Sequence, residues 1–248
     1  NKKLTKIGAG TQRVEDEISA IFGYAKIKRI DFDTMKNQKD LNDIFLEIES
    51  GEVDIIVGTQ MIAKGLHFPK IKFVGIVNAD TMLNIPDFRS SERTFSLITQ
   101  VAGRSGRDGD KGFVMIQTTN PEHYAIVSAK EHNYQDFFNS EIKHRMLLEL
   151  PPFFRLIKIV VRGRDENSVK KDIEKIGEIL KKDKNDSFKM LGPTPCSLEK
   201  INNNYRYHIL LKSKKVEVIQ NVIKKSIKLF KVSSKNYLEL DVDPNDLF

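Results

Sequence analysis

Apolar and polar residues follow one another along the first half of the chain in a pattern that predicts alternating helices and strands. Residues 11–22 repeat apolar side chains at helical spacing, with Thr11 as the expected N-cap, and residues 40–51 repeat this pattern between Asp40 and Gly51. Compact apolar runs predict short strands, the later ones buried on both faces, over residues 27–32, 53–58, 71–77 and 112–118. With a further helix expected over residues 90–102, this order favours a parallel α/β sandwich.

The order of elements changes after residue 150. Residues 121–150 have a helical pattern and run into Pro151 and Pro152, a stiff pair that we take as a domain junction. The elements expected beyond it are strand, helix, strand, strand, helix and strand, over residues 156–162, 166–182, 188–191, 205–212, 216–231 and 237–242. This β-α-β-β-α-β order is typical of a small ferredoxin-like α+β domain. We therefore expect an α/β domain over residues 1–125, a helical connector over 126–150 and a second domain over 151–248.

Positive charge is concentrated in the second half of the chain. The 248 residues carry 41 Lys or Arg and 34 Asp or Glu, for a net charge of +7. Residues 1–120 hold 17 basic and 16 acidic side chains, so the remaining residues carry a charge of +6. This excess points to an anionic partner such as nucleic acid, and a solvated lysine surface explains it equally well.

Several classes of protein are disfavoured. No apolar run approaches the roughly 18 residues that span a bilayer, and the amino terminus lacks the pattern of a signal peptide, so we expect a cytoplasmic protein. Cys196 is the single cysteine, and we expect an inert thiol rather than a nucleophile or metal ligand. The five histidines show no ligand spacing, so no metal site is expected. Because the chain begins at Asn1 inside a patterned segment, we expect it to be part of a longer protein.

The strongest candidate for chemistry lies at the end of the helix predicted over residues 90–102. Here the sequence reads Gln-Val-Ala-Gly-Arg-Ser-Gly-Arg, with Gln100 first and Arg107 last. Arg104 and Arg107 are three residues apart, so their guanidinium groups can converge on one anion, and their geometry suits phosphate oxygens. Gln100, about one turn earlier, can position a water or a hydroxyl. The alternative is a glycine-rich turn with solvated arginines.

A second motif follows the strand predicted over residues 53–58. It places Thr59 at the carboxyl end of that strand, where ligands bind in open α/β sheets. Gly65 allows the backbone to approach a ligand closely. The Lys64 side chain can face phosphate or water equally well.

The two motifs resemble motif VI and motif V of the superfamily 2 helicases. Further stretches in the same order are similar to the carboxy-terminal part of the PriA family, the bacterial replication-restart helicases also called primosomal protein N′. These stretches span nearly the whole chain and comprise residues 29–34, 78–80, 86–93, 150–153, 191–195, 205–207 and 240–244.

This resemblance implies a fold and a function. It implies that residues 1–125 form the second RecA-like lobe of an ATP-driven motor, in which Arg107 is the arginine finger and Gly65 and Arg104 contact ATP. It also implies that Thr59, Gln60 and Lys64 contact the nucleic-acid backbone. It further implies a 3′-to-5′ DNA helicase that recognises stalled or repaired replication forks and directs primosome assembly. His67 stands where many related helicases carry Asp, so we assign no ribose or metal contact to it.

The resemblance also implies partners. We expect branched and single-stranded DNA, single-strand-binding protein and primosome proteins to bind a monomer in the bacterial cytoplasm, associated with the nucleoid and not with a membrane. The domain from residue 151 would help to bind DNA. There Tyr205 and Arg206, on an expected strand edge, can stack on bases and pair with phosphate, whereas core packing explains a tyrosine equally well.

The sequence departs from a complete motor in one respect. It contains neither a GxxxxGK[ST] P-loop nor a DExH-type box, so we expect the isolated chain neither to hydrolyse ATP nor to unwind DNA. ATP and Mg²⁺ would need a first lobe, and the cysteines that bind Zn²⁺ in the family would lie before residue 1. The alternative function is a non-enzymatic DNA- or protein-binding module on a helicase-lobe scaffold. Another superfamily 2 translocase is disfavoured by the stretches beyond residue 151.

Overall fold

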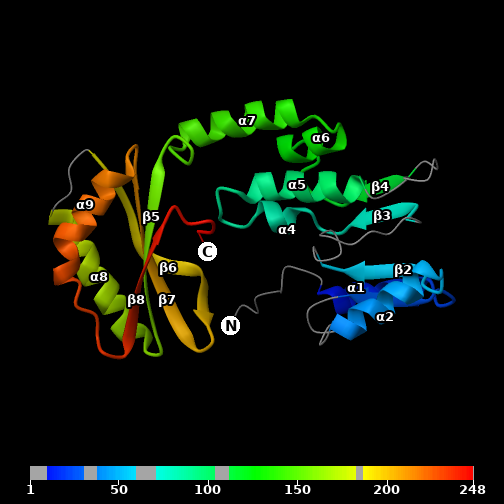
Figure 1. Cartoon of the computed structure of the whole chain (residues 1–248), viewed down its shortest axis with the longest axis horizontal. Coiled ribbons are helices and arrows are strands. Elements are labelled where there is room, and N and C mark those ends of the chain that lie inside the picture. Colours follow the sequence, from blue (N-terminus) through cyan, green and yellow to red (C-terminus); the bar gives the residue numbers. More distant parts are fainter. Residues whose placement is uncertain (1–9, 31–37, 60–70, 104–111, 183–186, 248) are drawn as a thin grey trace. The chain divides into compact units, whose positions relative to one another are not determined.

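A computed structural model describes residues 10–30, 38–59, 71–103, 112–182 and 187–247 (Figure 1). By their contacts, the residues divide into two compact units. The first comprises Asn1–Ile85 and Ser91–Phe137, and the second comprises Pro86–Ser90 and Phe138–Phe248. The division passes through a helix near residue 137 and assigns a short segment around residue 88 to the second unit.

The first unit begins with helices and strands in alternation. These elements are α1 (Thr11–Ile21), β1 (Ile27–Ile30), α2 (Gln38–Glu49) and β2 (Ile55–Gly58). β1 and β2 pair in parallel, with Ile27 opposite Ile55, as their apolar runs predicted. The expected cap of the first helix is wrong, because Gly10 occupies the N-cap position and Thr11 is the first helical residue.

The same unit continues with a second parallel pair and the helices around it. These are β3 (Phe73–Ile76), α4 (Asp80–Leu83), α5 (Ser90–Ala102), β4 (Phe113–Ile116), α6 (Tyr124–Lys130) and α7 (Tyr134–Leu147). β3 and β4 pair in parallel, which confirms the predicted α/β class. Phe95 of α5 stacks on Phe137 of α7 with ring centroids 4.2 Å apart. Phe73 and Phe113 are exposed on the other face of the pair, so these two strands are not buried on both faces as expected.

The second unit is built on a four-stranded antiparallel sheet. Its elements are β5 (Arg155–Gly163), α8 (Glu166–Lys182), β6 (Lys189–Ile201), β7 (Asn204–Ser213), α9 (Val216–Ser226), the 3₁₀ turn Ile227–Leu229 and β8 (Asn236–Val242). The strand order is β6-β7-β5-β8 and every pair is antiparallel. This arrangement confirms the ferredoxin-like domain that the order of elements predicted.

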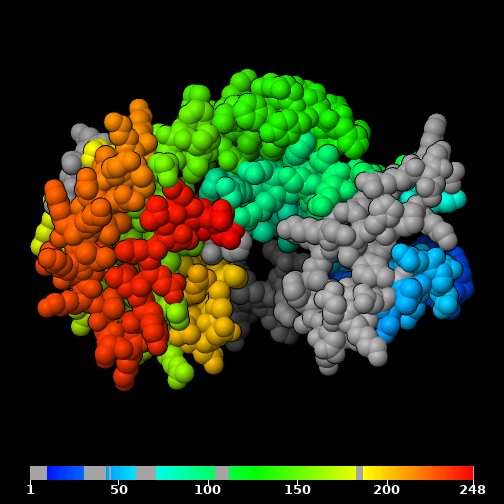
Figure 2. Space-filling view, viewed as in Figure 1, coloured from blue at the N-terminus to red at the C-terminus, as the bar shows by residue number. Residues whose placement is uncertain are grey.

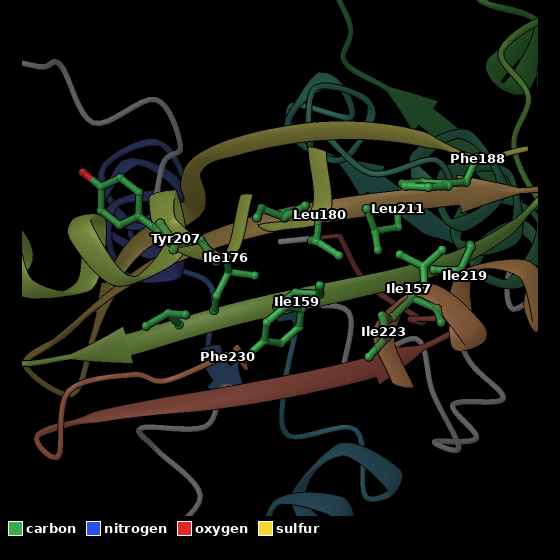
Figure 3. Packing of buried hydrophobic residues seen from close by; sticks show 14 of the residues in the cluster. Ile157, Ile159, Ile176, Leu180, Phe188, Tyr207, Leu211, Ile219, Ile223 and Phe230 are labelled. Carbon is green, nitrogen blue, oxygen red and sulfur yellow. The ribbon is translucent and has the colours of Figure 1, made fainter. Parts of the chain in front are cut away.

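Helices α8 and α9 cover one face of this sheet, and the apolar core lies between the helices and the sheet (Figure 3). Ile159 at the centre of β5 is fully buried, as are Ile173 on α8 and Ile219 on α9. Burial of each such side chain contributes about 1.5–3 kcal/mol. Figure 2 shows α9 and the residues that follow it, orange to red, at the surface of this unit.

Strand β6 is much longer than the sequence predicted. The strand expected over residues 188–191 continues to Ile201, with shifts in register between Leu191 and Thr194 and between Pro195 and Lys200. Gly192 has a φ of +91°, and a Cβ there would lie 2.8 Å from the carbonyl oxygen of His208. Only glycine fits this close approach of two strands.

Replacing Gly163 by alanine tests the packing at the end of β5. A Cβ at this position would overlap the side-chain oxygen of Asn236 and lie 3.1 Å from Cγ2 of Val169. Overpacking of this kind costs about 1–3 kcal/mol, so Gly163→Ala should lower the free energy of unfolding of the second unit by that amount. The measurement is unfolding in urea, with Gly23→Ala as the control, because the nearest atom to its added Cβ is 3.7 Å away. Equal stability of both variants would contradict the prediction.

Candidate functional site

The first predicted motif begins where β2 ends. Thr59 follows Gly58 directly and is exposed, so its hydroxyl stands at the carboxyl end of a parallel strand, as expected. Gln60, Lys64, Gly65 and His67 lie outside the described residues. The described part of this motif therefore consists of Thr59 and the strand that positions it.

Helix α5 leads to the second motif. The buried residues in its middle, Thr94, Phe95 and Ile98, fix the helix in the first unit. Gln100 is exposed near the end of the helix, and Gly103 N–H donates to the carbonyl of Thr99 at 3.1 Å, which extends the helical hydrogen bonding. Arg104 and Arg107 lie outside the described residues.

The two motifs are connected to opposite ends of strands. Thr59 follows the carboxyl end of β2, whereas the chain after Gly103 enters β4 at its amino end, at Phe113. In the sequence, the arginine motif therefore lies between the end of α5 and the start of β4, and not after the carboxyl end of a strand.

A network of polar groups joins the carboxyl ends of β3 and β4. Asp80 accepts hydrogen bonds from Thr118 Oγ1 at 2.9 Å and from Thr119 N–H at 2.8 Å. Asn78, with a φ of +54°, donates its N–H to Gln117 Oε1 at 3.2 Å. The Thr119 N–H, followed by the Thr118 hydroxyl, lowers the pKa of Asp80 below its usual value, because these groups stabilise the carboxylate. Sequence reasoning named residues 78–80 for their resemblance, but not this network between two strand ends.

In the second unit, Tyr205 and Arg206 lie in the interior of the sheet. β7, which carries both, pairs with β6 on one side and with β5 on the other, so the expected position on a strand edge is wrong. Lys200 contacts Tyr205: its Nζ lies 4.5 Å from the ring centroid and 3.3 Å from the hydroxyl. Tyr207 is buried on the helix-covered face and donates its hydroxyl hydrogen to Glu166 Oε1 at 2.9 Å.

The side chains of Tyr205 and Arg206 point to opposite faces of the sheet. Tyr207 is part of the core under the helices, and successive side chains of a strand alternate between faces, so Tyr205 shares the core face and Arg206 does not. Arg206 is opposite Arg162 of β5. Arg162 pairs with Glu239 and lies 4.6 Å from the ring centroid of Tyr237. The face away from the helices therefore brings together two guanidinium groups and an aromatic ring.

Buried titratable groups lie on the same face. Lys158 is 4% exposed, and burial lowers its pKa. Burial, together with the charges of Lys158 and Arg206, lowers the pKa of His208 from 6.5 to about 4. Nδ1 of His208 is buried and has no hydrogen-bond partner within the described part of the chain. Burial also raises the pKa of the Cys196 thiol, which fits the inert role expected for it.

A hollow of about 400 Å³ lies beside α9, and lysines line much of it. Glu149 accepts hydrogen bonds from Lys189 at 2.6 Å and forms an ion pair with Lys212 at 3.4 Å, and Lys189, the larger effect, lowers the pKa of Glu149. Lys214 and Lys215 complete the basic lining. The sequence showed an excess of positive charge, but not this group, because its members come from two strands and a turn.

The described residues contain no group of three or more His, Cys, Asp or Glu side chains that could hold a metal ion. No helix formed by them is long and apolar enough to cross a membrane.

Two family models match the chain in succession. Residues 7–109 match the Helicase conserved C-terminal domain, and residues 146–245 match the Primosomal protein N C-terminal domain. The first match covers Thr59, Gln100 and both predicted arginines, and the second covers the whole antiparallel sheet.

Similar proteins extend over nearly the whole chain. Replication restart protein PriA of Bacillus subtilis is 38% identical over 239 residues, which cover 96% of this chain and 30% of that protein. The proteins of the same name from Borreliella burgdorferi and Treponema pallidum are each 38% identical over 96% of this chain and 36% of their own length. The chain thus spans about a third of the length of these relatives.

The lowered pKa of His208 predicts a loss of stability in mild acid. Because the folded pKa is about 4 and the unfolded value 6.5, the unfolded chain binds the proton first as the pH falls. The free energy of unfolding should fall by about 2–3 kcal/mol between pH 6.5 and pH 4 through this group. In His208→Gln this part of the pH dependence should disappear from urea unfolding curves. His132→Gln, which removes an exposed imidazole, should keep the slope of the parent chain. The same slope in His208→Gln would contradict the prediction.

Proposed function

We infer that the chain is the carboxy-terminal part of a replication restart helicase of the PriA family. The observation that carries this inference is the order of the two family matches, a helicase domain followed by a primosomal protein domain, in one chain. We propose that the complete protein is an ATP-dependent 3′-to-5′ DNA helicase. It recognises stalled or repaired forks and directs primosome assembly in the bacterial cytoplasm.

The first unit supplies half of an ATP site. Arg107 acts as the arginine finger on the γ-phosphate, Arg104 and Gly65 contact the nucleotide, and Gln100 orients a water or hydroxyl. The exposed position of Gln100 at the end of a helix with a buried middle supports this assignment. A P-loop lysine and an acidic residue for Mg²⁺ belong to a first lobe, and the Zn²⁺ ligands of the family also belong to other parts of the complete protein. When bound, ATP supplies the phosphoanhydride bond whose hydrolysis drives the motor.

Two surfaces bind DNA. Thr59, Gln60 and Lys64 contact its backbone at the carboxyl end of β2, and the exposed position of Thr59 supports this. In the second unit Tyr205 and Arg206 contribute separately, because they point to opposite faces of the sheet. Arg206 pairs with phosphate beside Arg162, and Tyr205 stacks on a base in place of Lys200. Branched and single-stranded DNA, single-strand-binding protein and primosome proteins are the partners, and the protein acts as a monomer.

Replacement of Arg107 tests the ATP site. In the complete protein, Arg107→Ala should lower ATP turnover by roughly 10³–10⁵-fold and leave DNA affinity nearly unchanged, because the finger stabilises charge only in the transition state. Turnover is measured with forked DNA, and Arg164→Ala, which removes an exposed guanidinium elsewhere, should have no effect. The isolated chain of 248 residues should show no turnover above background.

Two results would contradict this proposal. Equal loss of turnover and DNA binding in Arg107→Ala would mean that Arg107 supports the fold. Turnover by the isolated chain would favour a complete site within it.

Replacement of Tyr205 and Arg206 tests DNA binding by the second unit. Tyr205→Ala should lower the affinity for single-stranded DNA by about 1–3 kcal/mol through lost stacking. Arg206→Ala should reduce the slope of log affinity against log salt by about 1. Fluorescence anisotropy with labelled single-stranded and forked DNA measures both effects, with Lys181→Ala on α8 as the charge control. Unchanged affinity in both variants would remove these residues from the site.

A further inference from the structure

The chain between α4 and α5 passes briefly through the second unit. Residues up to Ile85 and from Ser91 onward belong to the first unit, but Pro86–Ser90 belong to the second. Ser90 is also the first residue of α5 and is 6% exposed. The amino end of α5 is therefore held by a different set of contacts from the rest of the helix.

Residues near the end of the chain provide two of these contacts. Leu247 N–H donates to Asp87 Oδ2 at 2.9 Å, and Arg89 Nη1 donates to Asn245 Oδ1 at 3.0 Å. Their partners are 160 and 156 residues apart in the sequence. We name residues 243–247 the tail and these two hydrogen bonds the clasp.

Asp87 connects the tail to the start of α5. Its second carboxylate oxygen, Oδ1, accepts from Arg89 N–H at 2.8 Å, and its carbonyl accepts from Ser90 Oγ at 2.8 Å and Ser90 N–H at 3.1 Å. One residue thus binds the tail with one oxygen and shapes the entry to the helix with the others.

The tail is anchored to the start of β5, an inner strand of the antiparallel sheet. Asp243 forms an ion pair with Arg155, the first residue of β5, and its N–H donates to the Leu156 carbonyl at 2.8 Å. Phe88 is held from another side, because the Arg145 guanidinium lies 5.3 Å from its ring centroid. Arg145 is itself fixed by Glu141 at 2.6 Å. The sheet, the tail and the start of α5 therefore form one continuous set of contacts.

We propose that the clasp couples the DNA-binding domain to the ATP site and that Asp87 is the positioning residue of this coupling. The proposal rests on the proposed function. A change at the sheet moves the tail, and the tail moves the amino end of α5. A helix of 13 residues is about 20 Å long, and Phe95 and Ile98 hold its middle in the core of the first unit, so a shift of its amino end tilts the helix about these residues and displaces Gln100. The arginine motif follows Gln100 directly in the sequence.

The clasp includes Arg89, which carries a buried donor. Nε of Arg89 is buried without a hydrogen-bond partner among the described residues. An unsatisfied buried donor disfavours the closed state, so a partner on the second unit can shift the balance between closed and open.

Hydrogen exchange of the 248-residue chain tests the clasp without reference to any activity. A chain that ends at Asp243 loses both clasp bonds but keeps the Asp243–Arg155 pair, and it should exchange faster in the amides of residues 90–102 than the parent. Asp87→Ala removes one of the two clasp bonds, that to Leu247, so it should also speed exchange there, and adding it to the shortened chain should increase the rate by less than its effect alone. Asp165→Ala is the matched control: Asp165 accepts from Ser168 N–H at the start of α8 and does not bind the tail. It should accelerate exchange in α8 alone.

ATP turnover of the complete protein tests the coupling. Shortening the tail should reduce the stimulation of turnover by DNA by about fivefold or more, the range of ordinary coupling between sites, with KM for ATP and affinity for DNA unchanged. Asp87→Asn retains an acceptor oxygen and should restore part of the stimulation that Asp87→Ala loses.

The results separate the clasp from the proposed function. Unchanged exchange in residues 90–102 of the shortened chain would overturn the clasp whatever the enzyme does. Changed exchange with normal stimulation by DNA would overturn the coupling. Absence of DNA-stimulated turnover in the unaltered complete protein would overturn the proposed function, while the exchange experiment would still judge the clasp.

Discussion

The alternation of side chains along β5 is the constraint on which the second unit depends. β5 pairs with β7 on one side and β8 on the other, so its register fixes both neighbours. Ile157, Ile159 and Val161 face the helices, and a shift by one residue would place Lys158 and Arg162 in that core. Burial of two unpaired charges costs more than the stability of a typical domain allows. The same register separates Tyr205 from Arg206 and determines where Asp243 leaves the sheet.

Helix α5 begins in the second unit and continues in the first. Its middle is fixed by Phe95 and Ile98 in the core of the first unit, and its first residue is held by Asp87 in the second. Gln100 is exposed near the other end. When one end of a helix shifts, the other end shifts with it more than in a loop, because the backbone hydrogen bonds of the helix resist bending. The amphipathic pattern over residues 90–102 indicates the burial of Phe95 and Ile98, and the coupling through this helix is our proposal.

The sequence predicted regular elements well where one periodicity dominates. α5 and α8 have the bounds expected from their apolar spacing, and the ferredoxin-like order follows from six simple patterns. β6 was cut short at Leu191 because Gly192, Pro193 and Pro195 resemble a break. In the structure β6 is an edge strand with two register shifts, where prolines that cannot donate to the ladder are tolerated. The Asp80 network was missed because it depends on which strand ends are neighbours, which requires the pairing of β3 with β4.

Charge counting proved a weaker guide to the site than the position of individual groups. Of the basic residues that give the second half its charge of +6, Lys158 is buried, and Lys189 and Lys212 share Glu149. These side chains add little to the field that an approaching anion meets. Arg206 is a stronger candidate for binding phosphate than its charge alone suggests, because Arg162 lies opposite it on the same face of the sheet. In the first half, where the net charge is near zero, the most specific chemistry that we propose belongs to two arginines three residues apart. A phosphate is recognised by guanidinium groups fixed at the right spacing, and that spacing depends on the fold and not on net charge.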